Sequence, residues 1–165
     1  TTASSVAGIG ASLQTYNSGS GICGLNFNST SSGCFLGVSF RAPQDIAIAA
    51  PAAGSGQLYL DWMDVSGNAT TAVVSASVIY VPSGSEYAAG STSQLLGNAT
   101  CKALTSGSAG QNVSSSLFNF TAPTSRTGLI IVRFGRMSQA VGDTTQGNFV
   151  LFGLRLRYLA DRIGS

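Results

Sequence analysis

An alternation of apolar and polar side chains near the C-terminal end is the feature that most limits what this chain can fold into. In residues 149–159 every second position is apolar: Val150, Phe152, Leu154, Leu156 and Tyr158. A β-strand repeats every two residues, whereas a helix repeats every 3.6. The segment is therefore predicted to be a strand with an apolar side. Arg155 and Arg157 lie on its other side, facing solvent or, alternatively, a partner subunit or an acidic ligand.

A second strand is predicted directly upstream, in residues 128–134. This stretch is rich in β-branched and aromatic residues, which favour strands. Residues 135–147 connect it to the C-terminal strand and are rich in glycine and threonine, which is turn chemistry that leaves no room for a helical crossover. We therefore expect the two strands to form an antiparallel hairpin with a long loop, which supplies much of the core.

Two opposite charges, Arg136 and Asp143, stand at the two ends of this connecting segment. A guanidinium that paired with the carboxylate would close the loop and let Thr144 or Thr145 satisfy N–H groups of the turn. The alternative is that both are solvated loop charges. In either case the role that we predict for them is structural.

Similar runs of strand-forming residues recur along most of the chain, separated by Gly, Ser, Asn and Pro clusters. Eight strands are predicted, at residues 22–27, 34–40, 57–64, 71–81, 94–104, 113–121, 128–134 and 149–159. No amphipathic helix of about ten residues lies among them. The pattern predicts an all-β fold, a jelly-roll-like antiparallel β-sandwich, with residues 21–165 as one domain. Residues 1–20 are predicted to form an N-terminal arm, extended or disordered unless a neighbour orders it.

The alternation also predicts which side chains point into the core. In residues 57–64, Leu58, Leu60 and Trp62 share one side, and Asp61 takes the other because burying an unpaired carboxylate is costly. Residues 71–81 are apolar on both sides, which is typical of a central or doubly covered strand. In residues 113–121, the alternation predicts that Asn119 points outward.

Charged residues make up only 8% of the chain, about a third of the usual share. Solubility must then come from Ser, Thr, Asn, Gln and Gly, a surface that suits an extracellular or assembled protein. The chain has one lysine and no basic run, so we expect no nucleic-acid partner. No apolar stretch approaches the roughly 20 residues that span a bilayer, so we expect no membrane span.

Residues able to carry out catalysis are scarce. The chain has no histidine, so neither a Ser-His-Asp nor a Cys-His arrangement can be built, and a zinc site is close to excluded. No phosphate-binding glycine motif occurs. Among six carboxylates, only Asp61 with Asp64 or Glu86 offers a nearby pair, and calcium held by Asp61, Asp64 and backbone carbonyls is conceivable. We expect no enzymatic activity, no cofactor and no metal.

The three cysteines are Cys23, Cys34 and Cys101. Cys23 and Cys34 flank the turn-like residues 28–33, so a disulfide that closes a hairpin is geometrically plausible in an oxidising compartment. A bond between Cys34 and Cys101 is equally allowed, and small buried thiols are the third reading.

Five acceptor sequences for N-linked glycans occur among the eight asparagines: Asn28, Asn68, Asn98, Asn112 and Asn119. The abundance of Ser and Thr would give about two by chance. We expect glycans on some of them if the host is a eukaryote or an archaeon. In a bacterium or its virus, the excess would instead be a by-product of polar composition.

Three short motifs follow one another in the C-terminal half. A strand ending in Arg occupies residues 132–136, a loop with Asp-Thr occupies residues 142–144, and a closing strand with a Gly-hydrophobic-Arg-hydrophobic-Arg-Tyr ending occupies residues 150–158. Upstream, residues 38–45 contain Phe-Arg-Ala-Pro and residues 58–62 form a strand ending in Trp. This order resembles a β-sandwich module of bacteriophage and virus virion and tail-associated structural proteins. The resemblance, which covers residues 34–158, implies a capsid, decoration or fibre-head subunit.

The sequence thus predicts a non-enzymatic structural subunit of an extracellular assembly, most directly a virion protein. Its expected partners are copies of itself, and in addition other virion proteins or host-surface glycans. One alternative is a secreted filament or pilus subunit joined by strand donation from residues 1–20. Another is a carbohydrate-binding module that uses loops 83–93 and 106–112, with Tyr59 or Tyr87 as the stacking platform.

Overall fold

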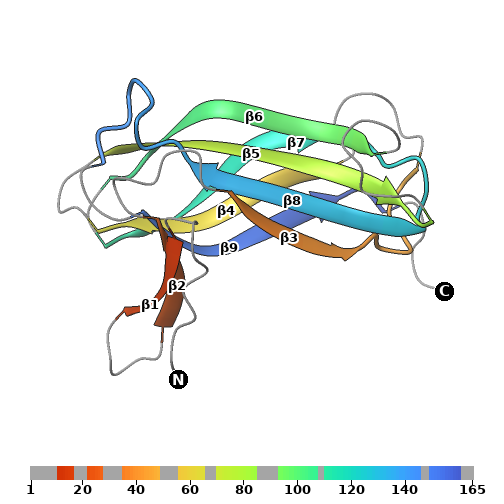
Figure 1. Cartoon of the computed structure of the whole chain (residues 1–165), viewed down its shortest axis with the longest axis horizontal. Helices are drawn as coiled ribbons and strands as arrows, with labels where there is room; N and C mark the ends of the chain where they lie inside the picture. The colour runs from red at the N-terminus through yellow and green to blue at the C-terminus, as the bar shows by residue number, and fades with distance from the viewer. Residues whose placement is uncertain are drawn as a thin grey trace.

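The predicted all-β class is confirmed by the computed structural model of the chain, which is an antiparallel β-sandwich (Figure 1). It describes residues 11–16, 22–27, 35–48, 56–65, 70–84, 93–107, 110–145 and 149–160. Within these ranges there is no helix. The strands are β1 (Ala11–Tyr16), β2 (Ile22–Phe27), β3 (Leu36–Arg41), β4 (Gly56–Asp64), β5 (Thr71–Pro82), β6 (Gln94–Thr105), β7 (Asn112–Phe120), β8 (Gly128–Arg136) and β9 (Phe149–Tyr158).

The strands form two layers. One sheet has five strands in the order β1-β2-β9-β4-β7, and the other has four in the order β3-β8-β5-β6. All pairings between neighbours are antiparallel. The sequence predicted β2 to β9 within about two residues at each end. β5 lies between β8 and β6, which confirms that this strand, apolar on both sides, is a central one.

One strand lies within the predicted N-terminal arm. Residues 11–16 form β1, which pairs with β2 along its whole length, from Ala11 opposite Phe27 to Tyr16 opposite Ile22. This part of the predicted arm is extended, as one of the two predicted states, and its partner is a strand of the same chain. The rest of the predicted arm lies outside the described residues.

The core lies between the two sheets and follows the predicted sides of the strands. Leu58, Leu60 and Trp62 of β4 are fully buried, as predicted. Aromatic rings fill the space next to Trp62: it stacks on Phe149 with 5.1 Å between centroids, and Phe149 stacks on Phe134 at 5.8 Å. Phe27 meets both phenylalanine rings edge-on. This aromatic cluster joins the two sheets.

The predicted hairpin of residues 128–134 with 149–159 is wrong. β8 pairs with β3 and β5, whereas β9 pairs with β2 and β4 in the other sheet. The two strands face each other across the core, where Phe134 and Phe149 stack. Each strand has an apolar side, and this alternation is the same whether two strands pair within one sheet or pack face to face across the core.

A β-bulge in β9 changes which of its residues face the core. Asp61 pairs with Gly153 and Trp62 with Leu151, so Phe152 is an extra residue in β9. Phe149 and Leu151 belong to the core before the bulge, and Leu154 and Leu156 pack against it afterwards. The prediction that Val150 and Phe152 share a side with Leu154 is therefore wrong, because the bulge shifts the alternation by one residue.

The two long edges of the sandwich differ. At one edge β6 and β7 meet across the sheets: the Thr121 amide donates to the Leu96 carbonyl at 2.9 Å, and the Lys102 ammonium donates to the Leu117 carbonyl at 2.6 Å. At the opposite edge the outer strand of the four-stranded sheet is β3. It faces β9, because β2 pairs with only residues 149–151 of that strand.

Candidate functional site

The candidate site is the edge of the sandwich between β3 and β9. β3 pairs with β8, and the pairing of β2 with β9 ends at Leu151. Over the described part of the chain, no strand pairs with the outer edge of β3 or with that of β9 from residue 152 to residue 158. Unpaired strand edges present backbone N–H and C=O groups to whatever approaches. This edge can therefore accept an additional strand.

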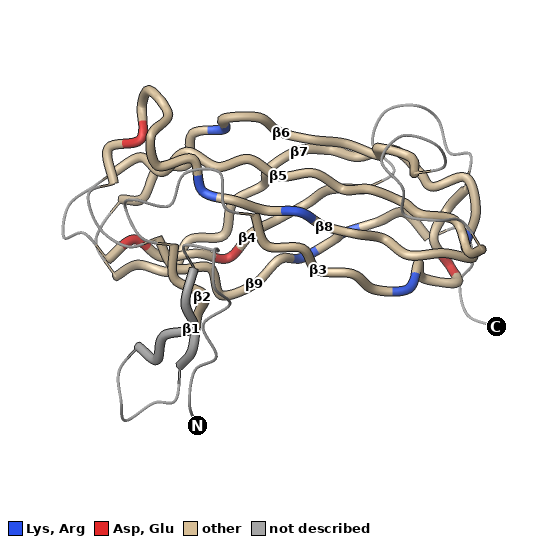
Figure 2. Tube along the Cα trace, viewed as in Figure 1, with Lys and Arg blue, Asp and Glu red and all other residues tan. Residues whose placement is uncertain are grey.

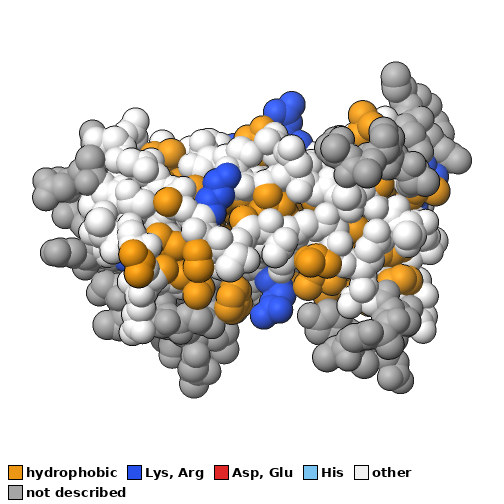
Figure 3. All heavy atoms as spheres, turned by 90° about the horizontal axis from the view of Figure 1, so that it is seen from above, with side chains coloured by type: hydrophobic (Ala, Val, Ile, Leu, Met, Phe, Trp, Pro, Cys, Tyr) orange, Lys and Arg blue, Asp and Glu red, His pale blue; other side chains and the backbone are white. Residues whose placement is uncertain are grey.

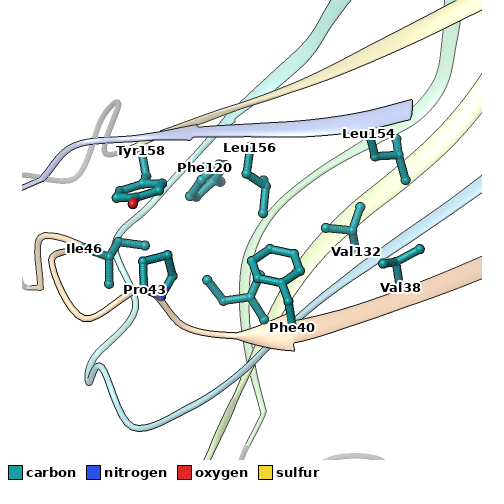
Figure 4. A pocket seen from close by; sticks show the side chains of 10 residues that line it. Val38, Phe40, Pro43, Ile46, Phe120, Val132, Leu154, Leu156 and Tyr158 are labelled. Carbon is teal, nitrogen blue, oxygen red and sulfur yellow. The ribbon is translucent and has the colours of Figure 1, made fainter. Parts of the chain in front are cut away.

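An apolar cavity of about 270 Å³ opens between these two strands (Figure 4). Val38 and Phe40 line it from β3, and Leu154 and Leu156 line it from β9. Phe120, Ile130 and Val132 complete its inner wall, and Pro43, Ile46 and Tyr158 lie at one end. No charged side chain contributes to this lining.

The exposure of Val38 shows that the cavity is open to solvent. Val38 lies on the same side of β3 as Leu36 and Phe40, between the sheets, yet 42% of it is exposed. By contrast, Leu58 and Leu60, which point inward from β4 in the middle of the sheet, are fully buried. An inward-facing valine that water reaches is energetically unfavourable, at about 25 cal/mol for each Å² of apolar surface.

A second apolar hollow continues the first along the same edge. It is lined by Leu25, Leu36, Leu151 and Phe152 and shares Val38 and Leu154 with the cavity. At the far end, the Ala47 amide donates to the Leu159 carbonyl at 2.8 Å and closes the space between the sheets. We call the cavity and this hollow together the open-edge groove. It runs from Leu25 and Leu36 to Ile46 and Tyr158.

One polar group stands at the closed end of the groove. The Tyr158 hydroxyl donates to a carboxylate oxygen of Asp45 at 3.0 Å. This hydrogen bond raises the pKa of the Tyr158 phenol above its usual range, and burial and the charge of Asp45 act in the same direction. The interaction joins β9 to the segment that follows β3.

Arg136 and Asp143, predicted as a structural pair, are brought together and buried. Arg136 Nη2 lies 3.0 Å from Asp143 Oδ1, and the two side chains are 0% and 1% exposed. Asp143 also accepts hydrogen bonds from the amides of Val73 and Thr145. Arg136 donates to the carbonyls of Phe27 and Thr145. The alternative of two solvated loop charges is wrong, since the pair fastens the β8–β9 connection to β5 and β2.

The outer side of the five-stranded sheet carries a polar network, on the opposite side of β9 from the groove. Arg155 donates to both carboxylate oxygens of Asp61, at 2.7 and 2.9 Å, and to the Ser114 hydroxyl at 2.6 Å. The guanidinium carbons of Arg155 and Arg157 lie 5.7 and 5.8 Å from the centroid of the Tyr59 ring. Because arginines cover this ring, it is a poor platform for stacking a sugar. Tyr87, the other proposed platform, lies outside the described residues.

Asp61 and Asp64, two of the carboxylates considered for catalysis or calcium, lie on opposite sides of β4. Asp61 lies on the outer side of β4 with Arg155, whereas Asp64 is fully buried on the side that faces the core. Glu86 lies outside the described residues. In the described ranges, no group of three His, Cys, Asp or Glu side chains is placed to hold a metal ion. The same ranges contain no helix, and therefore none that is long and apolar enough to cross a membrane.

Three of the predicted glycan acceptors lie on the surface. Asn98 on β6, and Asn112 and Asn119 on β7, are all exposed, which confirms the outward direction predicted for Asn119. These strands form the edge opposite the open-edge groove. Asn28 and Asn68 lie outside the described residues.

Of the three cysteines, Cys101 is exposed and unbonded, so the bond between Cys34 and Cys101 is not formed. The side chain of Cys23 and the whole of Cys34 lie outside the described part. Their disulfide stays a prediction.

The groove residues were not singled out by sequence reasoning. Val38 and Phe40 alternate with Ser39 in a short strand, and Leu154 and Leu156 alternate with Arg155, which is the ordinary pattern of a strand with one buried side. These side chains are exposed because no described strand lies next to them at this edge, and the residues of β3 and β9 themselves do not reveal this.

Comparison with protein-family models, with curated proteins and with solved structures found no match.

Proposed function

We propose that the chain is a non-enzymatic structural subunit that assembles with copies of itself in an extracellular particle, most directly a virion. The observation that carries this proposal is the open-edge groove: an uncharged apolar channel between two strand edges that pair with no other described strand. Such a groove suits the addition of a strand by another polypeptide, in which main-chain hydrogen bonds and buried alternate side chains act together.

The distribution of charge supports self-association. Charged residues are scattered singly along the strands (Figure 2). The face in Figure 3 is mostly uncharged, with a few Lys and Arg side chains among polar and apolar surface. Interfaces are depleted in charge at their centres because desolvating unpaired charges is costly. Copies of this chain can therefore pack closely at a low desolvation cost.

Two further observations support the extracellular and virion parts of the proposal. The motif order in residues 132–158 resembles virion modules, and the charge content is unusually low. The three described glycan acceptors lie on β6 and β7, at the edge opposite the groove. Glycans there would leave the groove accessible, so modification and assembly are compatible. The polar network around Tyr59 gives no comparable support to a carbohydrate-binding module.

A charge placed in the groove tests the proposal. Val38→Asp puts a carboxylate on an inward-facing position that is partly solvated in the free subunit and becomes buried when the groove is filled. We expect this change to raise the dissociation constant for self-association by more than about tenfold. Val141→Asp is the matched control, because Val141 is fully exposed in the β8–β9 connection. Sedimentation analysis over a concentration series measures both.

A wild-type protein that remains monomeric at its highest soluble concentration would overturn the proposal. So would equal effects of Val38→Asp and Val141→Asp. Electron micrographs of the assembled wild type test the virion part separately: we expect shells, fibre heads or regular arrays, and discrete dimers alone would refute it.

A further inference from the structure

We infer that the open-edge groove of one copy is filled by residues 1–10 of a neighbouring copy, added to β9 as a strand. This inference rests on the proposed function and names the partner segment for the same site. Four features of the chain lead to it: the unpaired edge, the length of the segment, its composition, and the position at which it enters the domain.

The shape of the groove requires an extended occupant. Among the described residues, no strand pairs with the outer edge of β9 from residue 152 to residue 158, and the outer edge of β3 faces it across the cavity. A helix or a side-chain cluster would leave the N–H and C=O groups of these edges without partners when it covered them. A strand satisfies them in register. Residues 153–158 span about 20 Å when extended, and residues 1–10 reach up to about 33 Å.

The composition of the groove requires a neutral, small and apolar occupant. No charged side chain lines it, and no charged residue occurs in the sequence before Arg41. In residues 1–10, Ala7 and Ile9 fall on one side of an extended strand, while Gly8 and Gly10 fall on the other. With Ala7 and Ile9 directed inward, Ile9 is the one bulky side chain of that side and meets Val38, Leu154 and Leu156.

The topology favours a neighbour over the chain's own N-terminal segment. β1 is antiparallel to β2, and β2 is antiparallel to β9, so β1 runs parallel to β9. Ala11, the first residue of β1, pairs with Phe27, which pairs with Phe149 at the start of β9. The groove extends from there toward Tyr158, in the direction in which β1 itself runs. Residues 1–10 would have to reverse direction to enter the groove of their own chain, whereas the groove of another copy requires no reversal.

Photo-crosslinking of the full-length chain tests this partner. The photoreactive residue p-benzoylphenylalanine is placed at position 9, and equal amounts of ¹⁴N- and ¹⁵N-labelled protein are mixed, dissociated and reassembled. After irradiation we expect crosslinks from position 9 to residues 153–158, about half of them joining differently labelled chains. Crosslinks that never join the two labels would show that each chain fills its own groove and would overturn the inference. Crosslinks to other surfaces would overturn it as well.

A pair of variants gives an independent readout. Ile9→Asp buries a carboxylate in the groove and should weaken association by at least about tenfold. Gly8→Asp introduces the same charge one residue away, on the side that points out of the groove, and should leave association within about threefold of the wild type. If Val38→Asp abolishes assembly while Ile9→Asp does not, the groove is filled by another segment. In that case the inference fails and the proposed function stands. A wild type that never assembles rejects both.

Discussion

Arg136 donates two hydrogen bonds to the carboxylate of Asp143, from Nε at 3.3 Å and from Nη2 at 3.0 Å, in a place that solvent does not reach. The carboxylate is also held by the amides of Val73 and Thr145. A single ion pair thus connects the end of β8, the β8–β9 connection and the central strand β5. It fixes the segment through which the chain passes from one sheet to the other.

Removing one partner of this pair should be strongly destabilising. Asp143→Ala leaves the Arg136 guanidinium buried without its counter-charge, and we expect unfolding free energy to fall by about 3–5 kcal/mol. Urea denaturation monitored by Trp62 fluorescence measures the loss, because Trp62 is fully buried in the core. A loss below about 1 kcal/mol would contradict a structural role for the pair.

The exposed pair between Arg155 and Asp61 should contribute much less. Its geometry is as good, at 2.7 Å, but the two side chains are 55% and 23% exposed. Water and salt screen such pairs, so we expect Asp61→Ala to cost at most about 1 kcal/mol and the cost to shrink further in high salt. The same denaturation assay applies. A cost equal to that of Asp143→Ala would show that burial does not determine the strength of these pairs.

Close packing at Gly128 gives a prediction about the core. A Cβ at this position would lie 2.3 Å from the Val81 carbonyl oxygen and 2.8 Å from a ring carbon of Tyr80. The backbone oxygen belongs to the neighbouring strand and cannot move freely, so Gly128→Ala should destabilise the fold by about 1–3 kcal/mol. Gly37→Ala is the control, because nothing lies within 4 Å of a Cβ there. Thermal melting compares the two variants, and equal melting temperatures would refute the prediction.

Much of the fold follows from the sequence because its strands have strong alternation and clear ends. Leu58, Leu60 and Trp62 were assigned to the core from spacing alone, and all three are fully buried. Spacing does not say which strands are neighbours, so β8 and β9 were predicted to pair when they lie in different sheets. The bulge at Phe152 has no sequence signature here. Because of it, the residues of β9 before position 152 face the sides opposite to those predicted.

The candidate site was less predictable for the same reason. Leu60 and Leu154 pair directly across β4 and β9 and both point inward. Leu60 is fully buried because strands flank it on both sides, whereas Leu154 lines a groove because β2 has left the edge of β9. Such a difference depends on contacts between distant segments. The pairing of Arg136 with Asp143 was one of two alternatives that the sequence left open, because the two residues are near in the chain, while their contacts with Val73 and Phe27 were not foreseen.

The end of the groove should show an unusual tyrosine titration. The hydrogen bond to Asp45 raises the pKa of Tyr158 in the folded protein above the ordinary 10.0. Its contribution to stability is therefore complete below pH about 10 and is lost as the pH rises through the pKa of folded Tyr158. Asp45→Asn should move the contribution of Tyr158 to the tyrosinate absorbance titration to lower pH, and Tyr158→Phe identifies that contribution by difference because it removes it. An unchanged titration in Asp45→Asn would contradict the assignment.

Glycan attachment gives the last prediction. Asn98, Asn112 and Asn119 are exposed on β6 and β7, whose edge is closed by the contact of Thr121 with Leu96. In a host that modifies such sites, we expect mass increments on these asparagines that a peptide N-glycosidase removes. Since the groove lies at the other edge, the glycosylated protein should assemble as well as an Asn98→Gln, Asn112→Gln and Asn119→Gln variant in sedimentation analysis. If the glycans alone block assembly, the interface must include β6 or β7, and the open-edge groove cannot be the only contact between subunits.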